Sequence, residues 1–208
     1  MTRDEQILAA AEALFFERSF DGVGVDEIGR AAGISGSAIY GYFDSKAEIL
    51  SSLFDKILDT LLRRMGEVDD DPRRELERIV RSFVELTVES EALAAIWVRE
   101  QRSLTADDRR RHERRLRHVS ERWSTCLDRC YPGHTADELT TVARGLQLML
   151  MSESLRPSTG RHAKDPEELL VAMALASLQA LEGRSSAQTP LANGTSAASK
   201  ASAASSIG

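Results

Sequence analysis

Residues 25–43 read VDEIGRAAGISGSAIYGYF, and this stretch decides the fold. It predicts a short helix with Ile28 on its apolar face, which ends at Gly33 because glycine suits the left-handed backbone of a tight turn. Ser35 follows as a natural N-cap for a second helix over 36–42. A helix, a tight turn and a second helix form a helix-turn-helix, whose second helix enters the major groove of DNA.

The second helix of this pair carries little of the bulk that a packing element needs. Ile39 and Phe43 are plainly core, whereas the remaining residues are Gly, Ser, Ala and two tyrosines. Small residues let a helix backbone approach base edges closely, and Ser and Tyr hydroxyls can bind phosphates or bases. The composition therefore favours a DNA-reading helix over the alternative, a loop-like connector with incidental tyrosines.

Residues 20–22 and 25–50 resemble the DNA-binding signature of the tetracycline-repressor (TetR) family. The resemblance rests on Ala-Ala-Gly-Ile-Ser at 31–35, Tyr-x-Tyr-Phe at 40–43 and Ser-Lys-x-Glu at 45–48. It implies an N-terminal helix-turn-helix DNA-binding domain over 1–45. A larger helical ligand-binding and dimerisation domain is then expected over 46–184.

The resemblance also assigns roles to the matching positions. Residues 35–38 occupy the places that face the major groove, and Tyr40 and Tyr42 occupy places that commonly contact phosphates. Lys46 matches a phosphate-binding lysine, which the N-terminal amides of its helix assist. The predicted DNA contacts are Ser35, Gly36, Ser37, Ala38, Tyr40, Gly41, Tyr42 and Lys46.

Three positions depart from the family pattern. Gly24 replaces a frequent Ser or Thr, Gly36 stands where Lys is frequent, and Gly41 stands where His is common. The first fifty residues contain four basic and nine acidic residues. A DNA reader of this composition must rely on local geometry, dimerisation and backbone amides more than on a basic field.

The sequence has 208 residues, a formal net charge of -6 and an ordinary globular mixture of 42% hydrophobic and 29% charged residues. The acidic balance argues against nucleic-acid binding by bulk charge. No apolar run approaches the ~20 residues of a membrane span, and the first residues lack the apolar core of a signal peptide. We therefore expect a cytoplasmic protein that does not bind membranes.

Helix-start patterns recur along the chain, whereas alternating strand patterns are almost absent, so the predicted fold class is all-α. Beyond Arg184, 14 of 24 residues are Ser or Ala, which predicts a disordered tail over 185–208. The expected helices span 3–18, 26–32, 36–42, 46–66, 72–89, 91–102, 106–130, 136–154 and 166–182.

The expected second domain shows none of the common enzyme motifs, such as a Gly-rich phosphate loop or His-Glu-x-x-His, so we expect no enzyme, cofactor or metal site. The resemblance predicts instead a ligand cavity among its helices. With aromatic residues at 5%, a mainly aliphatic pocket for a chain-like or lipid-like ligand is favoured. The candidate ligand contacts, each of which ordinary bundle core would also explain, are Phe83, Leu86, Ile96, Trp97, Arg114, Val119, Trp123 and Leu146.

Residues 109–117 contain six arginines. Arg110, Arg114 and Arg117 share one face of the expected helix. A solvated helix face is the simplest interpretation. The sharper hypothesis is an anion site at the rim of the pocket, for example for the phosphates of an acyl-coenzyme A, a ligand that several TetR-like regulators of lipid metabolism sense.

Cys126 and Cys130 lie four residues apart on one expected helix, and His134 follows. Thiols and imidazoles at such spacing can form a thiol or metal sensor. However, Pro132 and Gly133 should end the helix before His134, and a fourth metal ligand is not visible nearby. Buried free cysteines are the simpler interpretation.

The last two expected helices carry small and apolar faces. In the family these helices pair with their mates in a four-helix dimer interface, whereas packing within one subunit is the alternative. The faces are Val142, Ala143, Leu146 and Leu150 on one helix, and Leu169, Ala172, Met173, Ala176 and Ala180 on the other.

The patterns and the resemblance together predict a homodimeric, ligand-responsive repressor of the TetR type. It would bind a palindromic operator in double-stranded DNA and be released by a small hydrophobic ligand. Two alternatives stay open. One is a TetR-like activator, and the other is a helical lipid-binding protein or small enzyme with an incidental helix-turn-helix.

Overall fold

The computed structural model describes residues 1–155 and 164–184, and within these ranges it contains helices and no strand. The predicted all-α fold class is confirmed, whereas the predicted disordered tail over 185–208 lies outside the described residues. The helices are α1 (Arg3–Arg18), α2 (Val25–Ala31), α3 (Gly36–Ile39), α4 (Lys46–Met65), α5 (Pro72–Glu89), α6 (Glu91–Glu100), α7 (Ala106–Cys130), α8 (Ala136–Leu150) and α9 (Pro166–Arg184), with short 3-10 helices at Gln101–Ser103 and Ser152–Leu155.

The capping residues explain where these helices begin. Thr2 and Thr135 each form a reciprocal capping box with the glutamate three residues later. The Asp71 carboxylate accepts hydrogen bonds from the Arg73 amide at 2.9 Å and the Arg74 amide at 3.3 Å, at the start of α5. These local bonds satisfy amides that would otherwise lack partners, so the helix starts could be predicted from short sequence patterns.

Three predicted helices are shorter than expected. The helix expected over 36–42 ends at Ile39, because the Tyr42 amide donates to the Ile39 carbonyl at 2.8 Å in an i to i+3 bond and the chain continues as a turn. The helices expected over 91–102 and 136–154 stop at Glu100 and Leu150. Each is followed by a 3-10 segment, which apolar periodicity does not distinguish from an α-helix.

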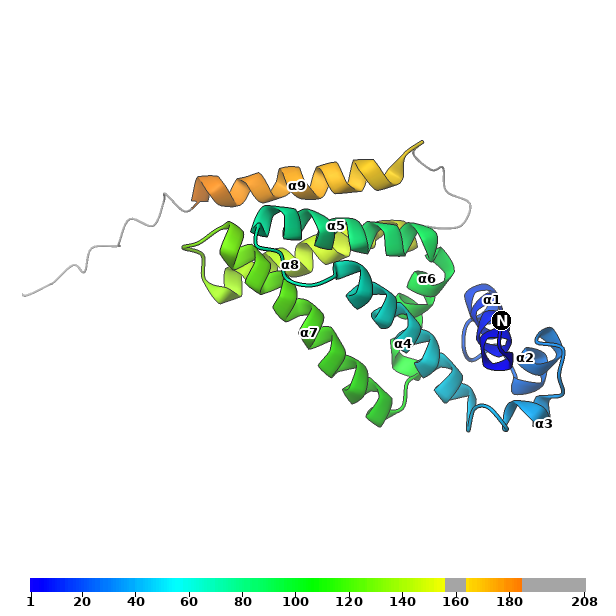
Figure 1. The fold of residues 1–208 in the computed structure, drawn as a ribbon. Coiled ribbons are helices and arrows are strands. Elements are labelled where there is room, and N and C mark those ends of the chain that lie inside the picture. Colours follow the sequence, from blue (N-terminus) through cyan, green and yellow to red (C-terminus); the bar gives the residue numbers. More distant parts are fainter. Residues whose placement is uncertain (156–163, 185–208) are drawn as a thin grey trace, which may run out of the picture.

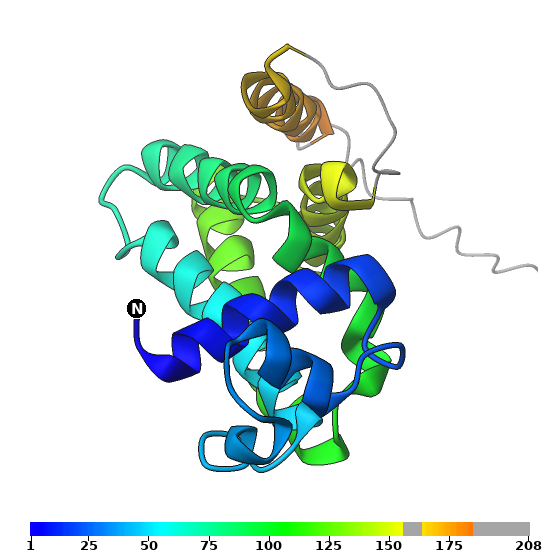
Figure 2. The ribbon, with the colours of Figure 1, turned by 90° about the vertical axis from the view of Figure 1, so that its right-hand side faces the viewer.

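The molecule has two parts that α4 connects. Helices α1 to α3 form a small group at one end, and α4 leads from them into a bundle of α5 to α9 (Figure 1). In the bundle, α5 packs against α4, α7 and α9. The turned view shows α1 lying across the end of the bundle, where it contacts α4 and α6 (Figure 2).

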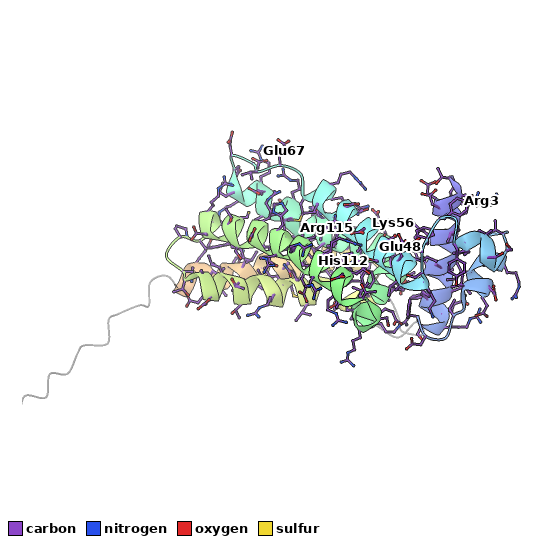
Figure 3. The ribbon with its side chains drawn as sticks, turned by 90° about the horizontal axis from the view of Figure 1, so that it is seen from below. Arg3, Glu48, Lys56, Glu67, His112 and Arg115 are labelled. Carbon is purple, nitrogen blue, oxygen red and sulfur yellow. The ribbon has the colours of Figure 1, made fainter. Side chains whose placement is uncertain are left out.

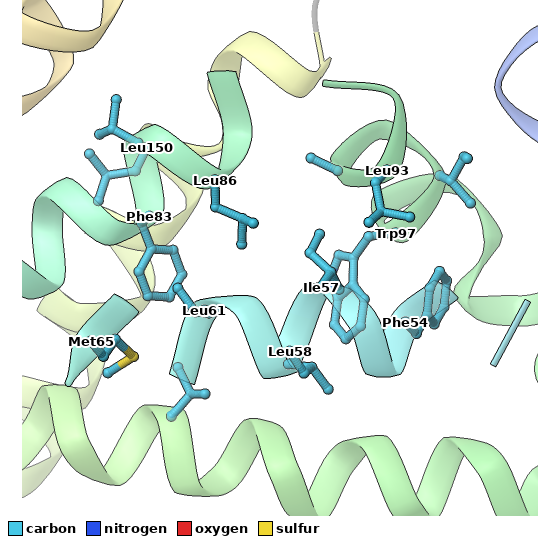
Figure 4. Close-up of a cluster of buried hydrophobic side chains, with 14 of the residues drawn as sticks. Phe54, Ile57, Leu58, Leu61, Met65, Phe83, Leu86, Leu93, Trp97 and Leu150 are labelled. Atoms are coloured by element: carbon cyan, nitrogen blue, oxygen red, sulfur yellow. The ribbon is translucent and has the colours of Figure 1, made fainter. Parts of the chain in front are cut away.

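One continuous hydrophobic core runs through both parts. Its centre is the apolar face of α4, from Phe54 to Met65, which meets side chains of α5, α6 and α8 (Figure 4). Residues at spacings of three and four share one side of a helix, so α4 can bury this face along its length. The domain boundary predicted between 45 and 46 falls at the N-terminus of α4.

Among the described helices, none combines the length and the apolar character that a membrane span requires.

Candidate DNA-binding and ligand sites

The turn between α2 and α3 depends on two glycines. Gly33 has a φ of 73°, the left-handed conformation that the sequence predicted, and the Ile34 amide donates to the Gly29 carbonyl at 2.9 Å. A Cβ added to Gly36 would lie 2.8 Å from the Asp26 Cα, so the first turn of α3 rests directly on α2. The close approach explains why this chain has glycine where the family often has lysine.

The outer surface of α3 is formed by small residues and two tyrosines. The Ser35 hydroxyl caps the helix by accepting from the Ala38 amide at 3.2 Å, and it lies 3.0 Å from the Ser37 hydroxyl. Ile39 and Phe43 are buried and anchor the segment. Tyr40 and Tyr42 are 57% and 50% exposed, so both phenol rings are open to solvent on this surface.

These observations place the eight predicted DNA contacts. Seven of them gather on or just after α3 at the free end of the molecule, with Gly36 half-buried and the others exposed (Figure 1). The eighth, Lys46, lies at the start of α4 and is half-buried. All eight contacts stay predictions.

Lys46 also has an intramolecular role that the sequence did not reveal. Its Nζ donates to the Phe20 and Val23 carbonyls, both at 2.8 Å, and lies 4.1 Å from the centre of the Phe20 ring. An ammonium group has three protons, so two are used inside the protein. Lys46 therefore stabilises the turn between α1 and α2.

The other side of the same turn is held by α6. The buried Glu100 carboxylate accepts from the Phe20 amide at 3.2 Å and from Arg99 Nε at 2.9 Å. The Arg99 guanidinium in turn donates to the Phe15 and Phe16 carbonyls at the end of α1. We call this set of contacts around Phe20, with Lys46, Arg99 and Glu100, the Phe20 junction. Phe20 and Glu100 are 80 residues apart in the sequence, and no short motif signals their contact.

A charged seam joins α7 to α4. The Asp55 carboxylate pairs with Arg111 at 3.1 Å and with Arg115 at 2.6 Å, and Arg115 also pairs with Asp59. His112, on the same side of α7, is 2% exposed (Figure 3). The arginines that meet α4 are therefore different from those on the face that the sequence singled out.

His112 sits at the inner edge of this seam. Its Nε2 lies 3.0 Å from the Ser51 hydroxyl, and its ring packs edge-on against Phe54 and Trp97. Burial lowers the pKa of His112 below its ordinary value of 6.5, and the nearby Asp55 carboxylate only partly opposes that shift. The neutral imidazole is therefore favoured at neutral pH.

An apolar pocket of about 130 Å³ lies between α4, α5, α6, α7 and α8. Ile57 and Leu61 of α4 face Phe83 and Leu86 of α5 across the region (Figure 4). The lining residues are Ile57, Leu58, Leu61, Phe83, Leu86, Thr87, Ala94, Trp97, Leu116, Val119, Ser120, Gln147 and Met151.

Four of the eight predicted ligand contacts line this pocket, namely Phe83, Leu86, Trp97 and Val119. The other four do not. Trp123 is fully buried behind the wall, with its ring centre 5.4 Å from that of Phe83, and Ile96 and Leu146 are also buried core. Arg114 is exposed on the outer face of α7. Helical periodicity identified buried residues, but it could not separate those that line a cavity from those that pack behind it.

A second pocket, of about 280 Å³, adjoins the first and shares Trp97 and Leu116 with it. Its lining is more polar and includes Arg102, Arg109, His112 and Glu113. Any anion site beside the apolar pocket would therefore involve arginines other than Arg110, Arg114 and Arg117.

The two predicted dimer faces have different environments. On α9, Leu169 is 52% exposed and Met173 is 48% exposed, and the three alanines of that face are exposed as well. On α8, Ala143, Leu146 and Leu150 are buried within the subunit. The predicted α8 face was therefore wrong for these three residues, which pack within the subunit as the alternative expected, whereas Val142 is half-buried and Leu148 is 66% exposed.

The two cysteines are free thiols, with Cys126 buried and Cys130 half-buried. The Cys126 thiol lies 3.3 Å from the Pro72 carbonyl oxygen and donates to it. His134 Nε2 lies 3.1 Å from the Leu181 carbonyl oxygen. No cluster of three or more metal-binding side chains occurs among the residues that the structure describes.

The geometry defines a class of protein, an all-helical chain in which an N-terminal helix-turn-helix is joined to a bundle that contains an apolar pocket. Residues 7–53 match the family described as bacterial regulatory proteins, tetR family. This match confirms the resemblance that residues 20–50 carry, over the helix-turn-helix and the start of α4.

Relatives with assigned functions are similar to part of the chain. The transcriptional repressor KstR2 of Rhodococcus jostii is 32% identical over 110 residues, which are 51% of this chain and 54% of KstR2. The transcriptional activator FasR of Mycolicibacterium smegmatis is 33% identical over 40% of this chain and 41% of its own length. The transcriptional regulator EthR of Mycobacterium tuberculosis is 37% identical over 35% of each chain. The chain thus spans about half, or less, of these relatives.

Solved structures show the same fold over most of the chain. The TetR family regulator PfmR of Thermus thermophilus has a TM-score of 0.72 at 23% identity, covering 83% of this chain and 97% of its own. KstR2 of Mycobacterium tuberculosis has a TM-score of 0.70 at 22% identity, covering 88% and 94%. AibR, solved with isovaleryl coenzyme A and operator DNA, has a TM-score of 0.69 at 18% identity, covering 83% and 96%.

Proposed function

We propose that this protein is a ligand-responsive, sequence-specific transcriptional regulator. In this proposal it is a repressor that a small hydrophobic ligand releases from a palindromic operator. The observation that carries the proposal is the physical link between two regions, the exposed α3 surface and the apolar pocket. Residues 1–45 act as the DNA-binding domain and residues 46–184 as the ligand-binding and dimerisation domain.

DNA recognition centres on α3. Residues 35–38 meet base edges in the major groove, where their small size permits close approach. Tyr40 and Tyr42 place exposed hydroxyls beside phosphates. Lys46 uses its remaining proton on a phosphate. Two α3 helices of a dimer would read half-sites about one helical turn apart, ~34–36 Å.

The ligand signal reaches α3 through α6 and α4. Ala94 and Trp97 line the pocket on α6, and Arg99 and Glu100 of the same helix hold the Phe20 junction. On α4, Ile57 lines the pocket and Lys46 holds the other side of that junction. A ligand that displaces either helix therefore moves the helix-turn-helix. Coupling of ~1–3 kcal/mol is the usual size for such effects.

The exposed face of α9 is the proposed centre of a homodimer. Leu169 and Met173 with the alanines around them form an apolar surface that a second copy can cover. Exposed positions of α8 near Leu148 complete it. The two-fold axis of that dimer is the reason for expecting a palindromic operator.

The proposed role is regulatory, and we place it in the cytoplasm, where chromosomal DNA is accessible. The names of the similar proteins support regulation over catalysis, since they are a repressor, an activator and a regulator of transcription. Coenzyme A thioesters are a second candidate ligand class, because AibR was solved with one. Their phosphates would lie in the second pocket, near Arg102 and Arg109.

Footprinting of the purified protein on DNA flanking its own gene tests the proposal. We expect protection of a palindrome in which the two half-sites are one helical turn apart. A protein that binds apolar ligands but gives no sequence-selective footprint would be a lipid-binding protein instead. Promoter fusions with and without the protein separate a repressor from an activator.

A further inference from the structure

The lining of the apolar pocket carries information about the chemistry of its ligand. The pocket is surrounded mainly by aliphatic and aromatic side chains, and among the described residues that line it none is charged. An ion placed there would lose its hydration without gaining a partner of opposite charge. The lining therefore selects against a ligand whose charge must lie inside the pocket.

Three lining residues have polar side chains, and one of them is already satisfied. The Thr87 hydroxyl lies 2.9 Å from the Val84 carbonyl oxygen and 3.2 Å from the Leu150 carbonyl oxygen. It has a single proton, which these carbonyls of the protein receive. Thr87 is therefore a poor hydrogen-bond donor for a ligand.

Ser120 and Gln147 are in a different position. Both side chains are half-buried and line the pocket, from α7 and α8 respectively. Neither side chain makes a hydrogen bond to any residue that the structure describes. The hydroxyl offers one donor and the amide offers two, and one carbonyl oxygen has two lone pairs with which to accept hydrogen bonds.

We propose that the pocket takes an uncharged, mainly apolar molecule with one carbonyl group, such as a long-chain ketone, whose oxygen accepts hydrogen bonds from Gln147 and Ser120. This inference rests on the proposed function in one respect, that the pocket is the ligand site. It narrows the ligand to one class and makes Gln147 and Ser120 specificity-determining residues.

The charges nearest to the pocket belong to its neighbour. Arg102, Arg109 and Glu113 line the second pocket, beyond the shared Trp97 and Leu116. The Arg109 guanidinium donates to the Arg102 and Leu104 carbonyls, each at 3.3 Å, so part of its hydrogen-bonding capacity is taken up within the protein. If the arginines of the second pocket bound the ligand, a carboxylate would bind more tightly than a ketone of the same length.

Calorimetric titration of the full chain, without DNA, with three matched probes tests the inference. The probes are methyl hexyl ketone, octane and octanoate. We expect the ketone to bind about tenfold more tightly than octane, since one or two hydrogen bonds distinguish them. Octanoate should bind more weakly than the ketone because its charge loses hydration.

Variants then assign the preference to residues. Gln147→Leu and Ser120→Ala should each reduce the ratio of ketone to octane affinity by about threefold to tenfold, and the double variant should bring it near one. Ser124→Ala, one turn further along α7 and outside the pocket lining, is the matched control and should leave the ratio unchanged. A ratio of affinities does not change merely because a variant is less stable.

Three results would overturn the inference. They are tighter binding of octanoate than of ketone, an unchanged ratio in the double variant, and no binding by any of the three probes. The footprint described above is measured without ligand. A failure of the DNA-binding proposal would therefore appear in the footprint and not in these titrations.

Discussion

The α3 surface and the apolar pocket are built in opposite ways. The α3 surface comes from a continuous stretch between residues 25 and 46, and each feature is set by a near neighbour, such as Asp26 against Gly36. The pocket draws on five helices, from Ile57 to Met151, and its shape depends on how they pack. A local site can be recognised from a motif, whereas a site assembled from distant segments requires the fold.

The largest expected effect tests whether the pocket depends on packing behind its wall. Trp123→Ala removes a fully buried ring that supports Phe83, and should lower the free energy of unfolding by ~3–5 kcal/mol. Chemical denaturation with a far-ultraviolet circular dichroism readout measures it. Trp97→Ala, at the pocket surface, should cost less stability and more ligand affinity. Equal losses of stability in Trp123→Ala and Trp97→Ala would show that the residue behind the pocket and the residue that lines it contribute alike.

The next test addresses the local construction of the α3 surface. Gly36→Ala places a Cβ against the Asp26 backbone, so we expect a loss of ~1–3 kcal/mol in stability of the helix-turn-helix and a larger loss of operator affinity. Gly145→Ala in α8 is the matched control, because nothing lies within 4 Å of its added Cβ and Gly145 is not a predicted DNA contact. Thermal unfolding and gel-shift titration of both variants measure the difference. A harmless Gly36→Ala would show that α3 does not rest on α2.

The two regions meet at the Phe20 junction, which gives a third test. Glu100→Ala leaves the Phe20 amide without its partner and should cost ~1–3 kcal/mol of stability. It should also reduce the effect of ligand on operator affinity, while ligand binding itself changes little. Glu100→Gln keeps an acceptor oxygen and should recover part of both. Undiminished release of Glu100→Ala from DNA by ligand would exclude this route of coupling.

The smallest expected effect concerns pH. Because burial lowers the pKa of His112 in the folded protein, the unfolded chain binds more protons, and the free energy of unfolding should fall as pH decreases below 6.5. The loss should continue until the pH passes the lowered pKa. His112→Gln should show a shallower dependence between pH 7 and pH 5. Parallel curves for the two proteins would contradict this role of His112 and would mean that other groups, such as Asp108 with its lowered pKa, dominate the dependence.

The features that could be predicted from the sequence are the local ones, and those that could not are assembled from distant segments. The turn at Gly33 and the capping of α1, α4, α5, α7 and α8 use bonds between residues two to five apart, so short patterns reveal them. The residues that line the pocket were predicted only in part. Trp97 and Trp123 have the same apolar character, and only the packing of the helices makes Trp97 line the pocket and Trp123 pack behind it. The ion pair of Arg115 with Asp55 and the contact of Glu100 with Phe20 join segments distant in sequence, and no pattern within either segment encodes the partner.

The inward-facing ammonium of Lys46 has a consequence for how such a regulator would find its operator. With two of its protons held by backbone carbonyls, and with more acidic than basic residues in the surrounding fifty, the DNA-binding end has little charge with which to hold random DNA. Retention on non-specific sites is mostly electrostatic, so encounters with the wrong sequence would be brief. The search would then proceed by repeated collision from solution more than by sliding along the chromosome, and operator occupancy would vary little with intracellular salt.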